Sequence, residues 1–186
     1  MYNNTESDET LIERVKKGGC EAFNPLVERY KLSLYRLMYR IVFNRDDAED
    51  LVEEAFIKAY RSISRFEIGR SFYAWLARIA VNNAINYKKK THNVKLEPIE
   101  WVEHSLTNGK NDPVEMTEEK LLKEKINIAM AKLPPEFRAI LILRVEENLC
   151  YDEISSILKI PKGTVMSRLA RARHKLKELF EKEGVH

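Results

Sequence analysis

The sequence predicts an all-α protein made of two small helical domains joined by a flexible linker. Apolar residues recur at three- and four-residue intervals along most of the chain, which is the period of an amphipathic helix. The strict alternation that marks strands is nearly absent. The helical period stops after about residue 92, where prolines, a glycine and several asparagines gather in an acidic stretch. The predicted units are therefore residues 1–92, a linker at 93–116, and residues 117–186.

Four helices are predicted in the first unit, at about residues 8–17, 21–42, 46–64 and 72–90. Asp8 is a suitable cap for the first helix, and Asp46 or Asp47 for the third, because a short acidic side chain accepts hydrogen bonds from unpaired N–H groups. The paired glycines Gly18-Gly19 end the first helix, since glycine leaves the helical conformation easily. The apolar side of each helix is expected to face one common core.

Four more helices are predicted in the second unit. One runs from about residue 117 to Pro134-Pro135, which ends it because proline lacks the N–H that a helix interior requires. The next covers about residues 137–147. A short helix with an apolar side follows, and Pro161 and Gly163 separate it from a final basic helix. A helix, a tight turn and a basic helix are typical of a DNA-reading helix-turn-helix.

Helical phase sharpens the interpretation of the final helix. At about 100° per residue, one stripe is expected to be buried: Val165, Leu169, Ala172, Leu176 and Leu179. The opposite face is formed by Ser167, Ala170, Arg171 and His174, with Thr164 at the helix start, Arg168 and Lys175 on one flank and Arg173 on the other. Short polar groups around one arginine suit base edges in the major groove, and flanking cations suit phosphates. A solvated amphipathic helix would look similar, but the apolar helix before it favours the helix-turn-helix.

Composition excludes several classes of protein. The chain has 186 residues, 44% hydrophobic and 33% charged, with a net charge of +3. No apolar run is long enough for a signal peptide or a membrane span. Cys20 and Cys150 are far apart and match no metal spacing, so we expect reduced thiols and a cytoplasmic protein. The scattered histidines form no metal-ligand pattern with the acidic residues, so neither a metal, a cofactor nor a catalytic site is expected.

The first unit contains three further patterns. Asp50, Glu53 and Glu54 form an acidic patch beside an apolar stripe, although a solvated helix start would look the same. The aromatic segment at residues 66–76 surrounds a Gly-Arg-Ser loop, and such rings either form a core or receive unstacked bases. The helix at residues 72–90 becomes polar and then basic toward its end.

These patterns stand in the order found in extracytoplasmic-function (ECF) sigma factors, the minimal group of the sigma-70 family. DAEDLVEEAFIKAYRSISRFE resembles conserved regions 2.1 and 2.2 of that family, and GRSFYAWLARIAVNNAINYKKK resembles regions 2.3 and 2.4. LPPEFRAILILRVEENLCYDEISSILKIPKGTVMSRLARARHKLK resembles region 4. The resemblance covers almost the full chain. It implies a region 2 helical bundle, a linker and a region 4 helix-turn-helix domain.

The resemblance also implies a role for each group of residues. Core RNA polymerase would be bound at its β′ clamp helices by Asp50, Glu53 and Glu54, and at its β flap by region 4. Melting and base capture at the minus-10 element would involve Phe66, Arg70, Ser71, Phe72 and Trp75, with Asn82, Asn83, Lys88 and Lys89 along the DNA. The minus-35 element would be read by Thr164, Ser167, Arg168, Arg171 and Arg173, together with His174 and Lys175. An anti-sigma factor is an expected regulator.

Two positions depart from the family pattern. Met166 stands where many members have Lys or Arg, and Ala170 where a larger side chain is common, so the minus-35 preference does not transfer directly. Two alternatives remain open at this point. One is an autonomous LuxR-like helix-turn-helix regulator that binds DNA as a dimer, and the other is a helical nuclease. Promoter-specific initiation with core polymerase separates both from a sigma factor.

Overall fold

The computed structural model describes residues 6–91 and 118–182, and all of their regular structure is helical. The α-helices are α1 (Asp8–Lys16), α2 (Asn24–Val42), α3 (Arg45–Ser62), α4 (Phe72–Thr91), α5 (Glu118–Ala131), α6 (Pro135–Val145), α7 (Tyr151–Leu158) and α8 (Lys162–Lys182). Two 3₁₀ turns, η1 (Cys20–Phe23) and η2 (Ile63–Arg65), precede α2 and follow α3. The all-α expectation is confirmed. The predicted linker at 93–116 lies outside the described residues.

Two helices are capped by residues other than the predicted ones. Ser7, not Asp8, caps α1, because its Oγ accepts from the Thr10 N–H at 3.2 Å. Asn44 caps α3 in place of Asp46 or Asp47, with Oδ1 2.8 Å from the Asp47 nitrogen. An N-cap residue needs extended backbone as well as a side-chain acceptor, and Asn44 has both (φ −146°).

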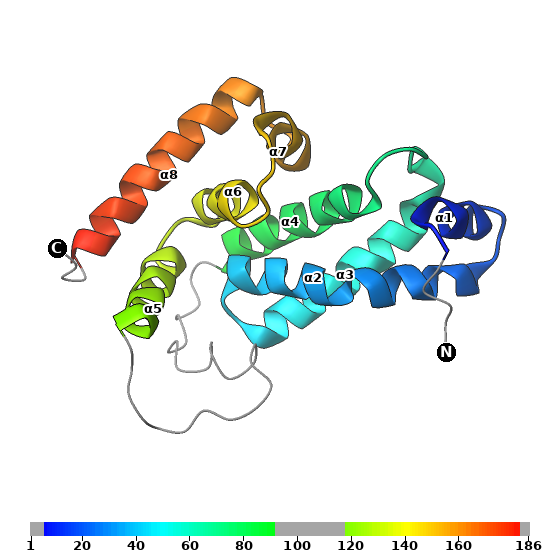
Figure 1. The fold of residues 1–186 in the computed structure, drawn as a ribbon, viewed down its shortest axis with the longest axis horizontal. Coiled ribbons are helices and arrows are strands. Elements are labelled where there is room, and N and C mark those ends of the chain that lie inside the picture. The colour runs from blue at the N-terminus through cyan, green and yellow to red at the C-terminus, as the bar shows by residue number, and fades with distance from the viewer. Residues whose placement is uncertain (1–5, 92–117, 183–186) are drawn as a thin grey trace.

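Helices α2, α3 and α4 pack together into a bundle, with α1 across one end (Figure 1). Their buried faces are built from leucine, isoleucine, valine and alanine at helical spacing, as the sequence predicts. Phe23, Phe56 and Phe72 meet edge to face at the α1 end of the bundle. These rings fix how the chain between α3 and α4 is held, which matters for the site described below.

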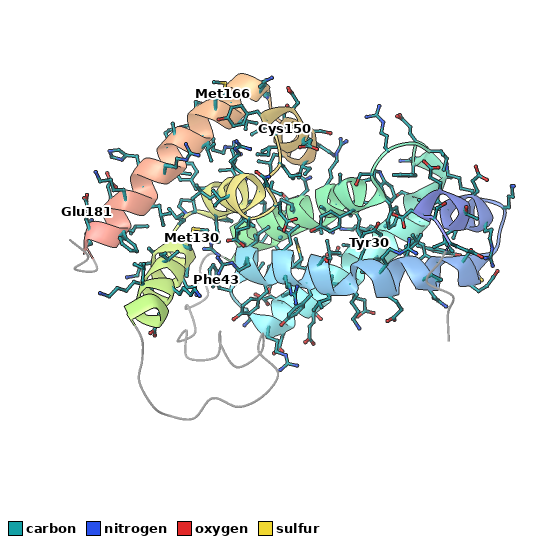
Figure 2. The ribbon with its side chains drawn as sticks, in the orientation of Figure 1. Tyr30, Phe43, Met130, Cys150, Met166 and Glu181 are labelled. Carbon is teal, nitrogen blue, oxygen red and sulfur yellow. The ribbon has the colours of Figure 1, made fainter. Side chains whose placement is uncertain are left out.

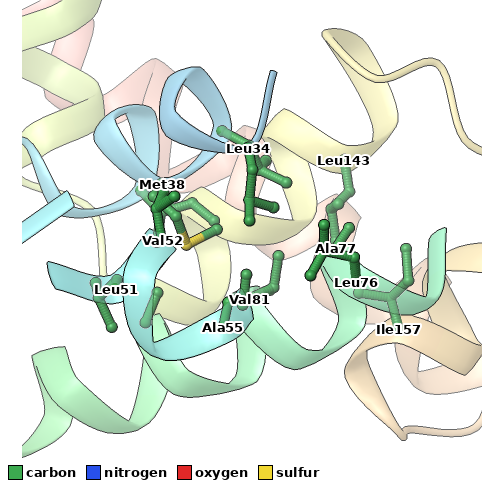
Figure 3. Close-up of a cluster of buried hydrophobic side chains, with 14 of the residues drawn as sticks. Leu34, Met38, Leu51, Val52, Ala55, Leu76, Ala77, Val81, Leu143 and Ile157 are labelled. Carbon is green, nitrogen blue, oxygen red and sulfur yellow. The ribbon is translucent and has the colours of Figure 1, made fainter. Parts of the chain in front are cut away.

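Helices α6, α7 and α8 form the second packed group, and α5 lies against α8. Figure 1 shows α6 and α7 between α4 and α8, with α8 on the outer side of the molecule. The two groups share one hydrophobic cluster. Leu143 of α6 and Ile157 of α7 are buried near Leu76 and Ala77 of α4 (Figure 3). In this structure the two halves therefore form one packed body.

Arg138 of α6 is buried at the seam between the halves, with 6% of its surface exposed. Its guanidinium donates to the carbonyls of Met130 (2.9 Å), Ala131 (2.6 Å) and Leu133 (2.9 Å), and also to that of Ile41 at the end of α2. Burial lowers the pKa of Arg138 to about 10, so the group is charged at neutral pH. One buried cation thus joins the C-terminal ends of α2 and α5, where carbonyls lack helical partners.

The guanidinium of Arg138 also lies over the ring of Phe43, with Cζ 4.9 Å from the ring centroid. Phe43 ends α2 in the left-handed conformation (φ 52°). Figure 2 shows it beside the end of α5, where Met130 is labelled. Cation–π attraction is stronger when the cation is desolvated. The contact therefore adds to the hydrogen bonds that hold the seam.

Candidate functional site

Helices α7 and α8 form the predicted helix-turn-helix. Helix α7 ends at Leu158, and the left-handed backbone of the next residue, Lys159 (φ 54°), reverses the chain. The Ser155 hydroxyl donates to the Ile160 carbonyl at 2.6 Å, and the Val165 N–H donates to the Pro161 carbonyl at 3.0 Å. Proline suits the start of α8 because the first helical N–H groups have no helical partner. These bonds fix the angle at which α8 leaves the turn.

The exposed face of α8 is the predicted one. Val165, Leu169 and Ala172 are buried, and Leu176 and Leu179 pack at the edge of the core. The exposed residues are Ser167, Ala170, Arg171, Arg173, His174 and Lys175. Thr164 and Arg168 are half-buried at the margin. Met166 is 52% exposed and is labelled on this helix in Figure 2, so it borders the exposed face that is predicted to contact DNA.

The charged groups of α8 differ in their pairing. Lys175 lies 2.9 Å from a Glu178 carboxylate oxygen, and His174 Nδ1 lies 3.3 Å from the other. The Arg171 Nε donates to the backbone carbonyl of Ser167, at 3.4 Å. Neither Arg171 nor Arg173 has a carboxylate partner among residues 6–91 and 118–182. These two arginines are therefore the cations best placed to meet phosphates or base edges.

The loop between α3 and α4 presents a mixed aromatic and cationic surface. Phe66 and Phe72, both predicted to act in melting, are buried in the core at 3% and 1% exposure. Trp75 is partly exposed and packs against Phe66 with ring centroids 5.3 Å apart. Arg70 and Ser71 are exposed. Phe66 and Phe72 thus support the loop from below, and Trp75 provides its accessible ring.

Two pockets flank Trp75. One, of about 580 Å³, is lined on the α4 side by Arg65, Arg70 and Arg78. The other, of about 470 Å³, includes Asn82 and Asn83. The Oδ1 of Asn83 accepts from Lys58 at 3.0 Å, while its buried Nδ2 has no hydrogen-bond partner among the described residues. Cations, an aromatic ring and amide groups are the side chains that hold a single nucleic-acid strand.

The basic end of α4 is held by acidic partners. Lys88 lies 3.0 Å from Asp47, which also accepts a hydrogen bond from the Tyr87 hydroxyl at 2.5 Å. That hydrogen bond, helped by burial and the Asp47 charge, raises the pKa of Tyr87 to about 12. Lys89 lies 2.8 Å from Glu136 of α6. The predicted minus-10 lysines are thus paired in this arrangement.

The pKa of the Glu136 carboxyl group is set by opposing effects. Burial raises its pKa, but the hydrogen bond from Lys89, a backbone N–H and the charges of Lys89 and Arg168 together hold the pKa below its ordinary value. The carboxylate is therefore charged at neutral pH. It links the basic end of α4 to the first turn of α6.

A third hollow lies between α2 and α3. It has a volume of about 960 Å³, an apolar base and six charged residues at its rim: Glu28, Lys31, Arg45, Glu49, Asp50 and Glu53. Leu32 lines it with 56% of its surface exposed. Of the predicted acidic patch, Asp50 and Glu53 line this groove, whereas Glu54 does not and pairs with Lys58 at 2.6 Å. An acidic rim around an apolar base suits a basic, amphipathic partner.

Sequence reasoning missed several residues of these surfaces. Leu32 lies outside the apolar stripe of α2, and an off-stripe leucine on a helix is a usable signal for a partner surface. Arg65 has no distinguishing pattern in the sequence, because it reaches the Trp75 pocket only through the η2 turn. From the sequence alone, Arg138 looks like a solvent-exposed helix residue. It is buried because α2 packs against α6.

Residues 6–91 and 118–182 contain no group of three or more His, Cys, Asp or Glu side chains that could hold a metal ion. Across the same ranges, no helix combines the length and the apolar character that crossing a membrane requires.

Comparison with known proteins identifies the class to which this architecture belongs. Residues 26–93 match the family described as Sigma-70 region 2, and residues 123–176 match Sigma-70, region 4. The first match covers nearly all of α2, together with α3, α4, the groove and the N-terminal side of the Trp75 pockets. The second covers most of the α5 to α8 group, including the helix-turn-helix.

Similar proteins of known class define the group within this family more closely. The chain is 38% identical to the ECF RNA polymerase sigma-E factor of Escherichia coli, over 90% of this chain and 91% of that protein. It is 35% identical to the RNA polymerase sigma-H factor of Pseudomonas aeruginosa, over 95% of both chains. The fold is similar to the sigma factor RpoE of Bartonella quintana, solved in complex with the anti-sigma factor NepR. That likeness has a TM-score of 0.64 and 25% identity, and covers 86% of this chain and 96% of that one.

The chain therefore belongs to the sigma-70 family, in its ECF group of RNA polymerase sigma factors. Its class of activity is transcription initiation. The alternative of an autonomous LuxR-like regulator is not favoured, because the half of the chain that would hold a sensing domain matches Sigma-70 region 2.

Proposed function

We propose that this chain gives core RNA polymerase its promoter specificity through three separate surfaces. The observation that carries this proposal is that one chain joins an exposed helix-turn-helix face to an acidic groove with an apolar base. DNA binding alone would require only the first. The groove is suited to the β′ clamp helices, with Asp50 and Glu53 at its rim. The residues from 117 onward would bind the β flap.

The two DNA surfaces would divide the promoter between them. Thr164, Ser167, Arg168, Arg171, Arg173, His174 and Lys175 would contact the minus-35 duplex. Trp75, Arg70 and Ser71, supported by Phe66 and Phe72, would hold the melted minus-10 strand, with Asn82, Asn83, Lys88 and Lys89 beside it. Unstacking costs a few kcal/mol per base step, and aromatic stacking returns about 1–3 kcal/mol per base. Two weak sites gain avidity once polymerase fixes their spacing.

The remaining assignments belong to the same proposal. Residues 1–92 and 117–186 would act as regions 2 and 4, joined by a linker at 93–116. The chain would act in the cytoplasm without a catalytic site, cofactor or metal of its own, because polymerase supplies the chemistry. An anti-sigma factor would control it, as the complex of the Bartonella quintana relative supports.

Reconstitution tests the proposal. The purified chain is added to core RNA polymerase with fragmented genomic DNA, and the 5′ ends of the transcripts are sequenced. The expected result is a set of start sites, absent with core alone, that share sequence elements near minus-10 and minus-35. Start sites identical to those of core alone would refute the assignment.

Variants separate the surfaces. Reversing Asp50 and Glu53 to lysine together should abolish capture of core polymerase, whereas Glu54→Lys should weaken it less because Glu54 lies outside the groove. Arg171→Ala should leave capture of core unchanged and reduce initiation at promoters that depend on minus-35. Equal loss of core capture in all of these variants would contradict the division of surfaces.

A further inference from the structure

The C-terminal helices cover the face of α4 that the proposed function assigns to the minus-10 strand. The side-chain amide of Asn82 donates to the carbonyl of Ile157 in α7, at 2.7 Å. Lys89 is paired with Glu136 of α6 at 2.8 Å. Two of the predicted minus-10 contacts are therefore occupied by the other half of the same chain.

The pocket beside Trp75 that contains three arginines is closed on its far side by α7. Its charged lining from the N-terminal half is Arg65, Arg78 and the pair of Arg70 with Glu67 at 2.6 Å. The first turn of α7 adds Asp152 and Glu153. A single strand entering this pocket would meet two carboxylates as well as the steric bulk of the helix. Like charges in close apposition disfavour a complex. Helix α7 therefore opposes strand binding through both shape and charge.

The minus-35 face is unaffected by this packing. Ser167, Arg171 and His174 stay exposed on α8, which lies on the outer side of the molecule in Figure 1. The arrangement that blocks one DNA surface therefore leaves the other available. This asymmetry distinguishes a specific shield from a general collapse of the chain.

Polar contacts away from the DNA surfaces hold the halves together. The guanidinium of Arg40 in α2 donates three hydrogen bonds to the carboxylate of Glu146, with N–O distances of 2.6 to 3.2 Å. The Tyr73 hydroxyl donates to Glu147 at 3.0 Å, and burial together with the Glu147 charge raises the pKa of Tyr73. These contacts can be removed without altering any residue assigned to DNA.

We propose that the free protein is self-shielded: packing of α6 and α7 on α4 masks the minus-10 surface while the minus-35 surface remains open. This proposal rests on the proposed function. A closed population lowers apparent affinity for a single strand by the fraction of molecules that are open. A partner that separates the halves would restore strand binding.

The test uses the full-length chain with Glu146→Ala and Glu147→Ala combined. The matched control, Glu9→Ala with Glu124→Ala, removes the same charge from exposed positions on α1 and α5. Opening is measured by energy transfer between dyes on the two native cysteines, since Cys20 and Cys150 are exposed and lie in different halves. Binding is measured on unlabelled protein by anisotropy, with a random-sequence single strand of about 12 nucleotides and with a random duplex.

The expected result is lower energy transfer and about five- to tenfold tighter single-strand binding in the variant, from loss of two contacts of modest strength. Duplex binding and the control should stay within about twofold of wild type. Lower energy transfer without tighter strand binding would overturn the shield. Unchanged energy transfer and unchanged affinity would overturn it too, because these contacts would then not hold the halves together. Failure to direct initiation with core polymerase would instead refute the proposed function, whatever the outcome of these binding measurements.

Discussion

Arg138→Met removes the buried cation at the seam and keeps an unbranched apolar side chain in its place. Four backbone carbonyls then lose their bond to the guanidinium: those of Met130, Ala131, Leu133 and Ile41. The Met130 carbonyl keeps a second donor, the Leu133 N–H at 3.1 Å. Three belong to the end of α5 and the residues just beyond it, and the fourth to the end of α2. The guanidinium donates to carbonyls from both halves, so the substitution should destabilise their junction.

The size of the effect follows from two opposing contributions. A hydrogen bond that involves a charged group stabilises by about 1.5–3 kcal/mol, and values near the lower end are appropriate for four bonds that share one guanidinium. Burial lowers the pKa of Arg138 from 12.5 to about 10, which corresponds to a desolvation cost of about 3 kcal/mol. The variant recovers that cost. A net loss of about 3–4 kcal/mol in the free energy of unfolding remains.

Urea unfolding followed by circular dichroism measures this loss. Arg138→Lys should fall between wild type and the methionine variant, because an ammonium has three donors and no planar fork. Arg36→Met, at an exposed position of α2, serves as the control and should stay within about 0.5 kcal/mol of wild type. If Arg138→Met unfolds within about 1 kcal/mol of wild type, the four carbonyls have other partners and the argument for the seam is wrong.

Three further perturbations test the packing, a loop and a charge pair. Leu143→Ala should cost about 2–4 kcal/mol in urea unfolding, since the side chain is fully buried at the seam; an unchanged midpoint would show that the seam is not packed. Gly69→Ala should cost about 1 kcal/mol through its left-handed φ of 88°, whereas Gly163→Ala, in the first turn of α8, should be neutral or stabilising. The folded pKa of Glu136 lies below its ordinary value of 4.5, so its stabilising pair with Lys89 is present above that pH and lost as pH falls through the folded pKa. Unfolding free energy should therefore depend less steeply on acid pH in Glu136→Gln, and identical pH profiles would exclude the pair.

Sequence reasoning succeeded where local geometry decides the outcome. The exposed face of α8 follows from the helical period alone, because Val165, Leu169 and Ala172 must share one side of any regular helix. The boundary between the two helices of the helix-turn-helix could be predicted equally well, since the ring of Pro161 restricts its own backbone. Existence and order of the helices were predicted for the same reason.

Tertiary packing decided what could not be predicted. An aromatic segment does not specify which of its rings turn inward, and the bundle buries Phe66 and Phe72 while leaving Trp75 at the surface. The apolar side of α7 favoured a helix-turn-helix with α8, and in the structure Ile157 of that side also meets α4 (Figure 3). A hydrophobic stripe reports that a face is buried, and it does not name the partner.

The hydrophobic cluster shared by the two halves has a consequence for how this chain evolves and how it is engineered. Leu76 and Ala77 in one half and Leu143 and Ile157 in the other fit one another, so a change of volume on one side has to be matched across the seam. The halves are therefore not freely interchangeable modules. Chimeras that exchange DNA-reading halves between relatives should inherit both sides of this seam from one parent, or carry compensating substitutions where the parents differ.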